Sequence, residues 1–205
     1  MSELCDSLSV VFTDSPEIED HLFAKAIRWA DQNPEDIIFW ARRKALERIP
    51  DVDVDWSSKV RALRSIRFGY NKSNLLRGCI DEAIKMESEI AAIICSIKLP
   101  KTCSQMGSLL ASLAAFCHGN DGRAVVVIDL REEEEEKDDD KQDETDPFEN
   151  SDFLDEEEEK TGELKTTERS QEDKDRFLRK LKLVSGIYTK NVLTFDGNTF
   201  LNVCL

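Results

Sequence analysis

The sequence has little histidine and little glycine. It contains two histidines, His21 and His118, and eight glycines among 205 residues. It has neither a G-x-G-x-x-G pattern nor a P-loop, so no glycine-rich cradle for a nucleotide phosphate is predicted. No spacing predicts a nucleophile within hydrogen-bond reach of a base. We therefore expect a protein that is not an enzyme and needs no cofactor. The alternative is an enzyme whose site is assembled only by folding.

Long hydrophobic runs are also missing. The longest, Ile90–Cys95, has six residues, whereas a membrane-spanning helix needs roughly 20 mostly apolar residues. The N-terminus lacks the basic stretch followed by an apolar stretch that is typical of a secretory signal. We therefore expect a nuclear or cytoplasmic protein that is not secreted and does not enter a membrane.

Cysteine is present but not in the spacing of a metal or redox site. No pair forms a C-x-x-C motif, and the gaps between Cys95, Cys103 and the Cys117-His118 pair match no standard zinc site. We expect no metal site, and reduced thiols at all six positions: Cys5, Cys79, Cys95, Cys103, Cys117 and Cys204.

Charge of one sign is concentrated in one part of the chain. The net charge is −15, but residues 131–170 alone hold 6 Lys+Arg against 20 Asp+Glu. This stretch has few apolar residues and should be a disordered acidic linker over 131–169. The negative total argues against broad, non-specific binding of nucleic acid.

Residues 1–118 carry patterns that predict a helical domain. Ser15-Pro16-Glu17 and Asn33-Pro34-Glu35 each place a capping side chain before a proline and an acid, the signature of a helix start. The spacing of apolar residues then predicts five helices, and five short-linked amphipathic helices favour a bundle. The predicted helices cover about 15–31, 34–49, 56–70, 73–99 and 102–118.

The rest of the chain predicts smaller elements, so the expected fold is mainly α. Residues 119–130 form a turn and a β-type apolar segment. Residues 170–205 predict a helix, ended by Gly186, and then a β-hairpin around Asp196-Gly197. A lone hairpin is marginal in water, so a three-stranded sheet that includes residues 124–130 is an alternative.

One stretch resembles a known interaction motif. Branched aliphatic residues at 125–128, with Asp129 and Leu130, are followed by a run of acids, and this pattern resembles a SUMO-interacting motif. The resemblance implies that the aliphatic segment adds a strand to a partner's sheet edge while the acids meet a basic rim. The partner-binding residues are then Val125, Val126, Val127, Ile128, Asp129, Leu130, Glu132, Glu133 and Glu134.

The same aliphatic residues have a second interpretation. A run of valine and isoleucine is also normal for a strand buried inside a sheet. In that case the acids that follow lie in a loop that points into solvent. The sequence does not separate a core strand from a docking strand.

A basic group gives a second functional hypothesis. Six cations surround Phe68 and Tyr70, and a basic helix with aromatic neighbours can contact phosphate and stack on bases. It can equally bind the acidic segment of the same chain. The six residues are Lys59, Arg61, Arg64, Arg67, Lys72 and Arg77.

We therefore expect a non-enzymatic adaptor or regulatory protein that acts through protein–protein contacts. Its partner is predicted to be SUMO, a SUMO-like sheet edge or a basic protein. The alternative is a nucleic-acid-associated regulator of the kind that viruses encode, in which the acidic segment shields the basic helix. The sequence predicts neither the oligomeric state nor the identity of the partner.

Overall fold

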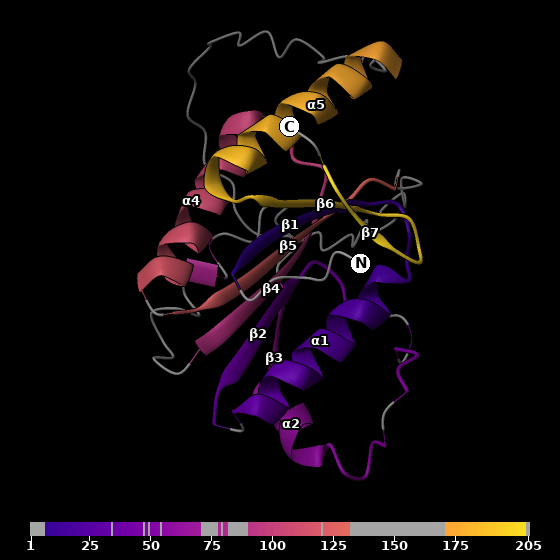
Figure 1. Cartoon of the computed structure of the whole chain (residues 1–205), viewed down its shortest axis with the longest axis vertical. Coiled ribbons are helices and arrows are strands. Elements are labelled where there is room, and N and C mark those ends of the chain that lie inside the picture. The colour runs from indigo at the N-terminus through magenta and orange to yellow at the C-terminus, as the bar shows by residue number, and fades with distance from the viewer. Residues whose placement is uncertain are drawn as a thin grey trace, which may run out of the picture.

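Seven strands of the chain form a single mixed β-sheet in the computed structural model (Figure 1). The structure describes residues 7–33, 35–46, 48, 50–53, 55–70, 78, 80–81, 90–119, 121–131 and 171–203. The strand order is β3-β2-β4-β5-β1-β6-β7, and every neighbouring pair is parallel except the antiparallel β6 and β7. The strands are Leu8–Thr13 (β1), Ile37–Arg42 (β2), Ile66–Tyr70 (β3), Ile90–Lys98 (β4), Arg123–Asp129 (β5), Asn191–Phe195 (β6) and Phe200–Asn202 (β7).

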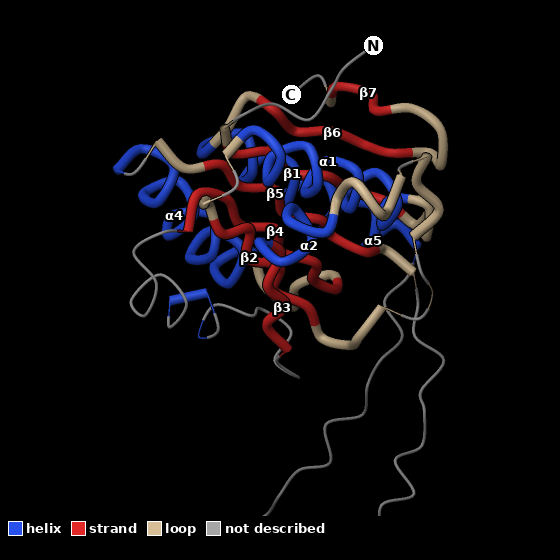
Figure 2. Tube along the Cα trace, turned by 90° about the horizontal axis from the view of Figure 1, so that it is seen from below, coloured by secondary structure: helices blue, strands red, loops and turns tan. Residues whose placement is uncertain are grey.

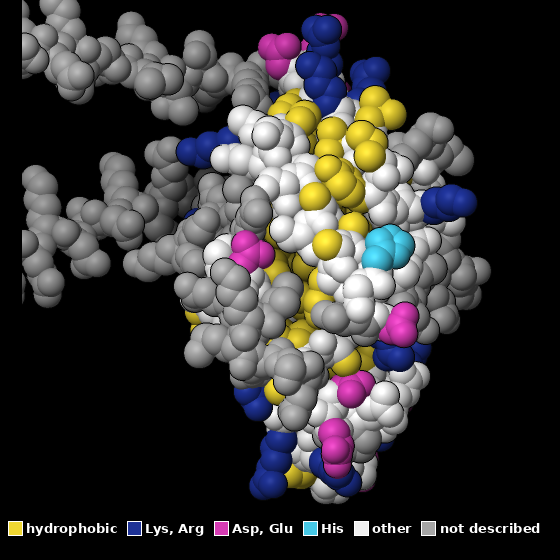
Figure 3. Space-filling view, turned by 90° about the vertical axis from the view of Figure 1, so that its left-hand side faces the viewer, with side chains coloured by type: hydrophobic (Ala, Val, Ile, Leu, Met, Phe, Trp, Pro, Cys, Tyr) yellow, Lys and Arg dark blue, Asp and Glu magenta, His cyan; other side chains and the backbone are white. Residues whose placement is uncertain are grey.

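Helices cover both faces of the sheet (Figures 1 and 2). Ile18–Gln32 (α1) and Val60–Ser65 (α2) pack on one face, and Cys103–Gly119 (α4) and Gln171–Tyr188 (α5) pack on the other. Figure 3 shows the side of α4 and α5, where apolar side chains gather on the surface. Among the helices that the structure describes, none combines the length and the apolar character needed to cross a membrane.

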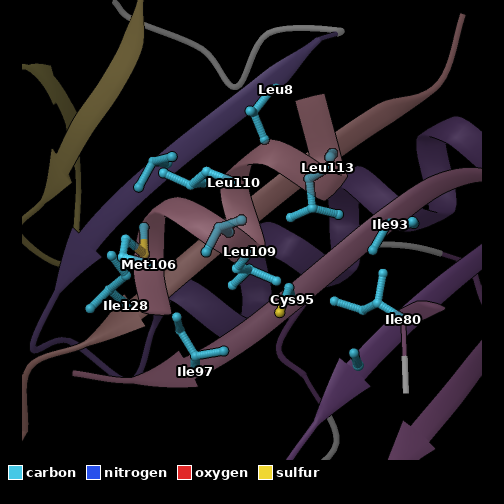
Figure 4. Close-up of a cluster of buried hydrophobic side chains, with 14 of the residues drawn as sticks. Leu8, Ile80, Ile93, Cys95, Ile97, Met106, Leu109, Leu110, Leu113 and Ile128 are labelled. Atoms are coloured by element: carbon cyan, nitrogen blue, oxygen red, sulfur yellow. The ribbon is translucent and has the colours of Figure 1, made fainter. Parts of the chain in front are cut away.

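Two hydrophobic clusters, one on each face of the sheet, hold these layers together. Strand residues alternate between them: Val126 and Ile128 belong to the cluster under α4 and α5, whereas Val125 and Val127 belong to the cluster under α1. Figure 4 shows the first cluster, in which Ile128 lies near Met106 of α4. Burial on both faces explains why the central strands are almost continuously apolar.

The predicted fold class, mainly α with an N-terminal bundle of five helices, is wrong. The protein has an α/β fold in which strands of residues 8–129 and strands of residues 191–202 belong to one sheet. The predicted bundle of residues 1–118 and the predicted C-terminal element of 170–205 are therefore parts of the same layered structure.

Three predicted helices are replaced, in whole or in part, by strands. The helix expected at 34–49 is β2, the helix at 56–70 is divided into α2 and β3, and the end of the helix at 73–99 is β4. Short apolar runs satisfy a helical spacing and a buried strand equally well, so periodicity alone did not separate the two. Most residues of 71–89 lie outside the described part of the chain.

The other predicted helices and the hairpin are confirmed, with small shifts at their ends, whereas the acidic linker predicted at 131–169 lies, apart from Arg131, outside the described residues. The helices expected at 15–31 and 102–118 are α1 and α4, and the C-terminal helix is α5, which continues through Gly186 to Tyr188. The hairpin turns at Asp196-Gly197, where Gly197 has a φ of +102° that favours glycine. The three-stranded alternative is wrong, because β5 pairs with β1 and β4 and not with the hairpin.

Candidate functional site

The aliphatic residues of the SUMO-like motif form the middle strand of the sheet. Val125–Ile128 lie in β5, whose register pairs Val126 with Val10 of β1 on one side and with Cys95 of β4 on the other. The side chains of these four residues are between 0 and 2% exposed. Val125–Ile128 therefore form a core strand, as in the second of the two interpretations of this segment.

This placement leaves no edge of β5 for a partner. Strand addition needs a row of unpaired backbone N–H and C=O groups, and both edges of β5 carry ladder pairs to its neighbours. Binding of SUMO by these residues would therefore require the middle of the sheet to open. Glu132, Glu133 and Glu134, the acidic part of the predicted site, lie outside the described residues.

The end of β5 is held by a cluster of charged groups. The Asp129 carboxylate accepts hydrogen bonds from Nε and Nη2 of Arg131, at 2.9 and 2.8 Å, and from the Arg131 backbone N–H at 2.9 Å. Lys98 at the end of β4 lies 3.0 Å from the same carboxylate. The Leu130 N–H donates to the Thr13 carbonyl of β1 at 2.8 Å. Contacts to β4 and β1 therefore fix the point at which the acidic stretch begins.

This cluster changes the acidity of Asp129. Partial burial raises the pKa of the carboxyl group, but the hydrogen bonds from Arg131 and Lys98 outweigh burial and hold the pKa below its usual value. Asp129 is therefore a carboxylate at neutral pH. Its negative charge is already matched by two cations of the folded part.

The carboxyl end of β2 carries a second ion pair. Arg42 at the end of β2 donates to Glu19 of α1 at 2.6 Å, and its side chain is 7% exposed. The Arg42 Nη1 atom has no hydrogen-bond partner among the described residues. The chain continues from β2 to α2 on one face of the sheet and from the neighbouring β4 to α4 on the other face. In open α/β sheets, ligands usually bind at the point where two neighbouring strands lead to opposite faces.

The predicted basic group is spread over a helix and a strand. Arg61 and Arg64 lie on α2 and Arg67 lies on β3, all three exposed, whereas Lys59 forms an ion pair with Asp31. Phe68 is partly buried, and its ring centroid lies 5.6 Å from that of Trp40.

Lys72 and Arg77 lie outside the described residues. The exposed arginines therefore do not form the single helix face that the sequence predicted.

Cys117 and His118 line one shallow cavity of about 300 Å³ at the amino ends of β1 and β5. Burial raises the pKa of the Cys117 thiol to about 11, so the thiol is protonated at neutral pH and is a poor nucleophile. Asp121 lines the same cavity, but within the described part of the chain no three ligand-type side chains are placed to hold a metal ion.

Sequence reasoning found Asp129 but missed its partners. Lys98 was assigned to a helix, so nothing placed it beside the end of residues 124–130. The signal that could have found the cluster is a charged residue directly after each of two buried apolar runs, because parallel strands end at the same edge of a sheet. Compared with models of protein families and with curated protein sequences, the chain matches none of them.

Proposed function

We propose that the protein is a non-enzymatic regulatory or adaptor protein that binds a basic partner protein through the acidic residues 132–170. The folded α/β part acts as the platform that presents these acids. The observation that carries the proposal is the fixed exit of β5 at Asp129 and Arg131, from which a stretch with the whole excess negative charge of the chain begins.

Charge supports this proposal. Residues 132–170 hold 5 Lys+Arg and 20 Asp+Glu, so the rest of the chain holds 23 of each and is neutral. A net charge confined to one segment attracts oppositely charged partners over a distance of about 8 Å at physiological salt and increases the rate of encounter. A basic surface on a protein is the chemistry that this segment fits best.

The position of the segment in the fold also supports the proposal. It lies between β5 and α5, in a connection that leaves the carboxyl edge of the sheet. Binding loops of parallel α/β sheets lie at that edge, and connections longer than about 15 residues inside a domain are usually functional or linkers. The acids are thus attached at both ends to ordered elements.

The proposal places the contact in the acidic residues and not in the aliphatic strand. Val125–Ile128 are needed for the core, so they stay in the sheet while the partner is bound. The basic group is not proposed as a nucleic-acid site, because Lys59 is paired and the exposed arginines lie on two different elements.

The test compares the full chain with a variant in which residues 132–170 keep their length and every Asp and Glu becomes Asn or Gln. The probe is a synthetic peptide rich in lysine and arginine, and calorimetry measures its affinity at several salt concentrations. We expect the full chain to bind with an affinity that falls as salt rises, and the neutral variant to lose at least about tenfold in affinity.

A matched control changes the folded part and leaves the acids in place. Asp53→Asn removes an exposed acid of the platform and should leave the affinity unchanged. Equal binding by the full chain and the neutral variant would disprove the proposal. SUMO is measured in parallel, and tight binding of SUMO to the folded chain that Ile128→Ala abolishes would also contradict it.

A further inference from the structure

The outer face of α4 carries no charged side chain. In a chain of which 35% of the residues are charged, this helix of 17 residues contains no Asp, Glu, Lys or Arg. Its outward positions follow a spacing of four and three residues and hold small or neutral side chains. These positions are Ser104, Ser108, Ala111, Ala115 and His118.

α5 lies beside α4 and carries two exposed apolar side chains, Leu183 and Ile187, which we call the ridge. α5 packs closely along α4, so that a Cβ added at Gly107 would lie 3.6 Å from the Tyr188 hydroxyl and 3.8 Å from Val184. Leu183 and Ile187, the residues directly before Val184 and Tyr188, point outward and are 58% and 76% exposed. We call these two residues, together with the outward residues of α4, the α4–α5 face.

Figure 3 shows this side of the molecule. Apolar side chains gather over the two helices, and the Lys, Arg, Asp and Glu side chains in view lie mainly around this area. Exposed large apolar side chains that lie together usually mark an interaction surface. The outward side chains of α4 are small, whereas those of the ridge are large. Another helix can therefore pack closely on α4, since the distance of about 8–10 Å between packed helices depends on the side chains at the contact.

We propose that the α4–α5 face is the contact between two copies of this chain. In a contact with two-fold symmetry, residues near the axis meet their own copies. A charged residue there would meet a like charge, which is strongly unfavourable. The α4 face is free of charge along its whole length, whereas an interface with a different partner does not need this property. The ridge residues Leu183 and Ile187 of each copy would then pack on the small residues of the other copy.

The α4–α5 face is small, so we expect a dimer that dissociates at low concentration. α4 has 17 residues and is about 26 Å long. The ridge covers only the last turns of α5, because Asp173, Arg176 and Lys180 before it are exposed charged residues. The face therefore covers less than the roughly 500 Å² that two full helices would span, whereas each partner of a standard interface buries about 800 Å².

The test measures the mass of the full chain in solution. Light scattering and sedimentation equilibrium, from about 1 to 100 µM, should give twice the chain mass at the upper concentrations. In one variant, Ala111→Glu and Ala115→Glu place like charges near the axis, and both substitutions keep good helix formers. We expect the dissociation constant to rise at least about tenfold.

A second variant and a control separate the contact from folding. Leu183→Gln with Ile187→Gln removes the apolar ridge without adding charge and should also weaken the dimer. Val60→Glu changes a side chain that is 48% exposed on α2, on the opposite face of the sheet, and should leave the dimer intact. Far-UV circular dichroism confirms that each variant is folded.

Salt provides an independent readout. The acidic segments of two copies repel each other, and salt screens this repulsion, so the dimer should become tighter as salt rises. A monomer at every concentration would overturn the proposal. A dimer that both variants retain, or one that salt dissociates, would show that another contact joins the copies and would overturn it equally. None of these outcomes depends on the binding of a basic partner.

Discussion

Asp129 shows how a single residue joins the sheet to the acidic stretch. It is the last residue of β5 and pairs in register with Thr13 of β1 and with Lys98 of β4. Its carboxylate accepts two side-chain hydrogen bonds from Arg131, and the Lys98 ammonium lies 3.0 Å away. These contacts keep a negative charge at a half-buried position and direct the chain out of the sheet.

Asp129→Asn tests this role. Because the pKa of Asp129 in the folded protein lies below its ordinary value of 3.8, the carboxylate stabilises the fold above about pH 4. This stabilisation is lost as the pH falls through the lower pKa of the folded state. We expect the variant to lose about 1–2 kcal/mol of unfolding free energy at pH 7, and the difference to shrink toward pH 3. Urea unfolding at both pH values measures it.

The exposed Asp53→Asn variant is the control, and it should unfold like the natural chain at both pH values. An Asp129→Asn variant that loses the same stability at pH 7 and at pH 3 would contradict the role of the charge.

At the scale of elements, the sequence predicted those helices that have one apolar face and failed where strands are buried on both faces. α1, α4 and α5 were found because each alternates buried and exposed positions. Helices were predicted at β2 and β4 because Asn33-Pro34-Glu35 resembles a helix start and because Ile90, Ile94 and Ile97 also fit a helical spacing. The abundance of isoleucine and aromatic residues in them was the unused sign of a strand.

The candidate site was likewise predicted only where a local sequence signal exists. Asp129 was named from the sequence because it stands next to a recognisable motif. The contact to Lys98 depends on the order of the strands, which brings β4 beside β5, and no local pattern contains that order. The role of Val125–Ile128 depended on it as well, since only the neighbouring strands distinguish a core strand from a docking strand.

The junction between α4 and β5 gives a prediction at this scale. A Cβ added at Gly122 would lie 2.4 Å from the ring of Phe116, which is 5% exposed. Gly122→Ala should therefore force a shift in the packing of α4 on the sheet and cost about 1–3 kcal/mol of unfolding free energy.

Gly119→Ala is the matched control, because no heavy atom lies within 4 Å of its added Cβ. Thermal and urea unfolding of both variants measure the difference. Equal stability of the two would show that the contact between Gly122 and Phe116 is not as tight as the structure has it.

At the scale of the whole molecule, residues 132–170 carry the whole net charge of −15, and the rest of the chain carries none. β5 pairs with β1 and β4, and α5 packs on α4 and leads into β6, whichever residues join β5 to α5. The long connection should therefore contribute little to stability, since the entropic cost of a loop grows only with the logarithm of its length.

Replacement of residues 132–170 by a Gly/Ser linker of equal length tests this expectation. We expect the unfolding free energy to stay within about 1 kcal/mol of the natural value, while binding of the lysine-rich peptide is lost. Urea unfolding and calorimetry on the same preparation measure both. A variant that no longer unfolds cooperatively would show that the acidic residues are part of the fold.

Hydrogen exchange of the backbone amides of residues 123–130 in the full chain distinguishes a core strand from a docking strand. If Val125–Ile128 form the middle strand of the sheet, their amides should be among the slowest to exchange, with opening free energies close to that of global unfolding. The basic peptide should leave their exchange unchanged. Exchange of these amides at the rate of an unfolded chain would contradict their place in the middle of the sheet, because the segment would then be free to dock on a partner.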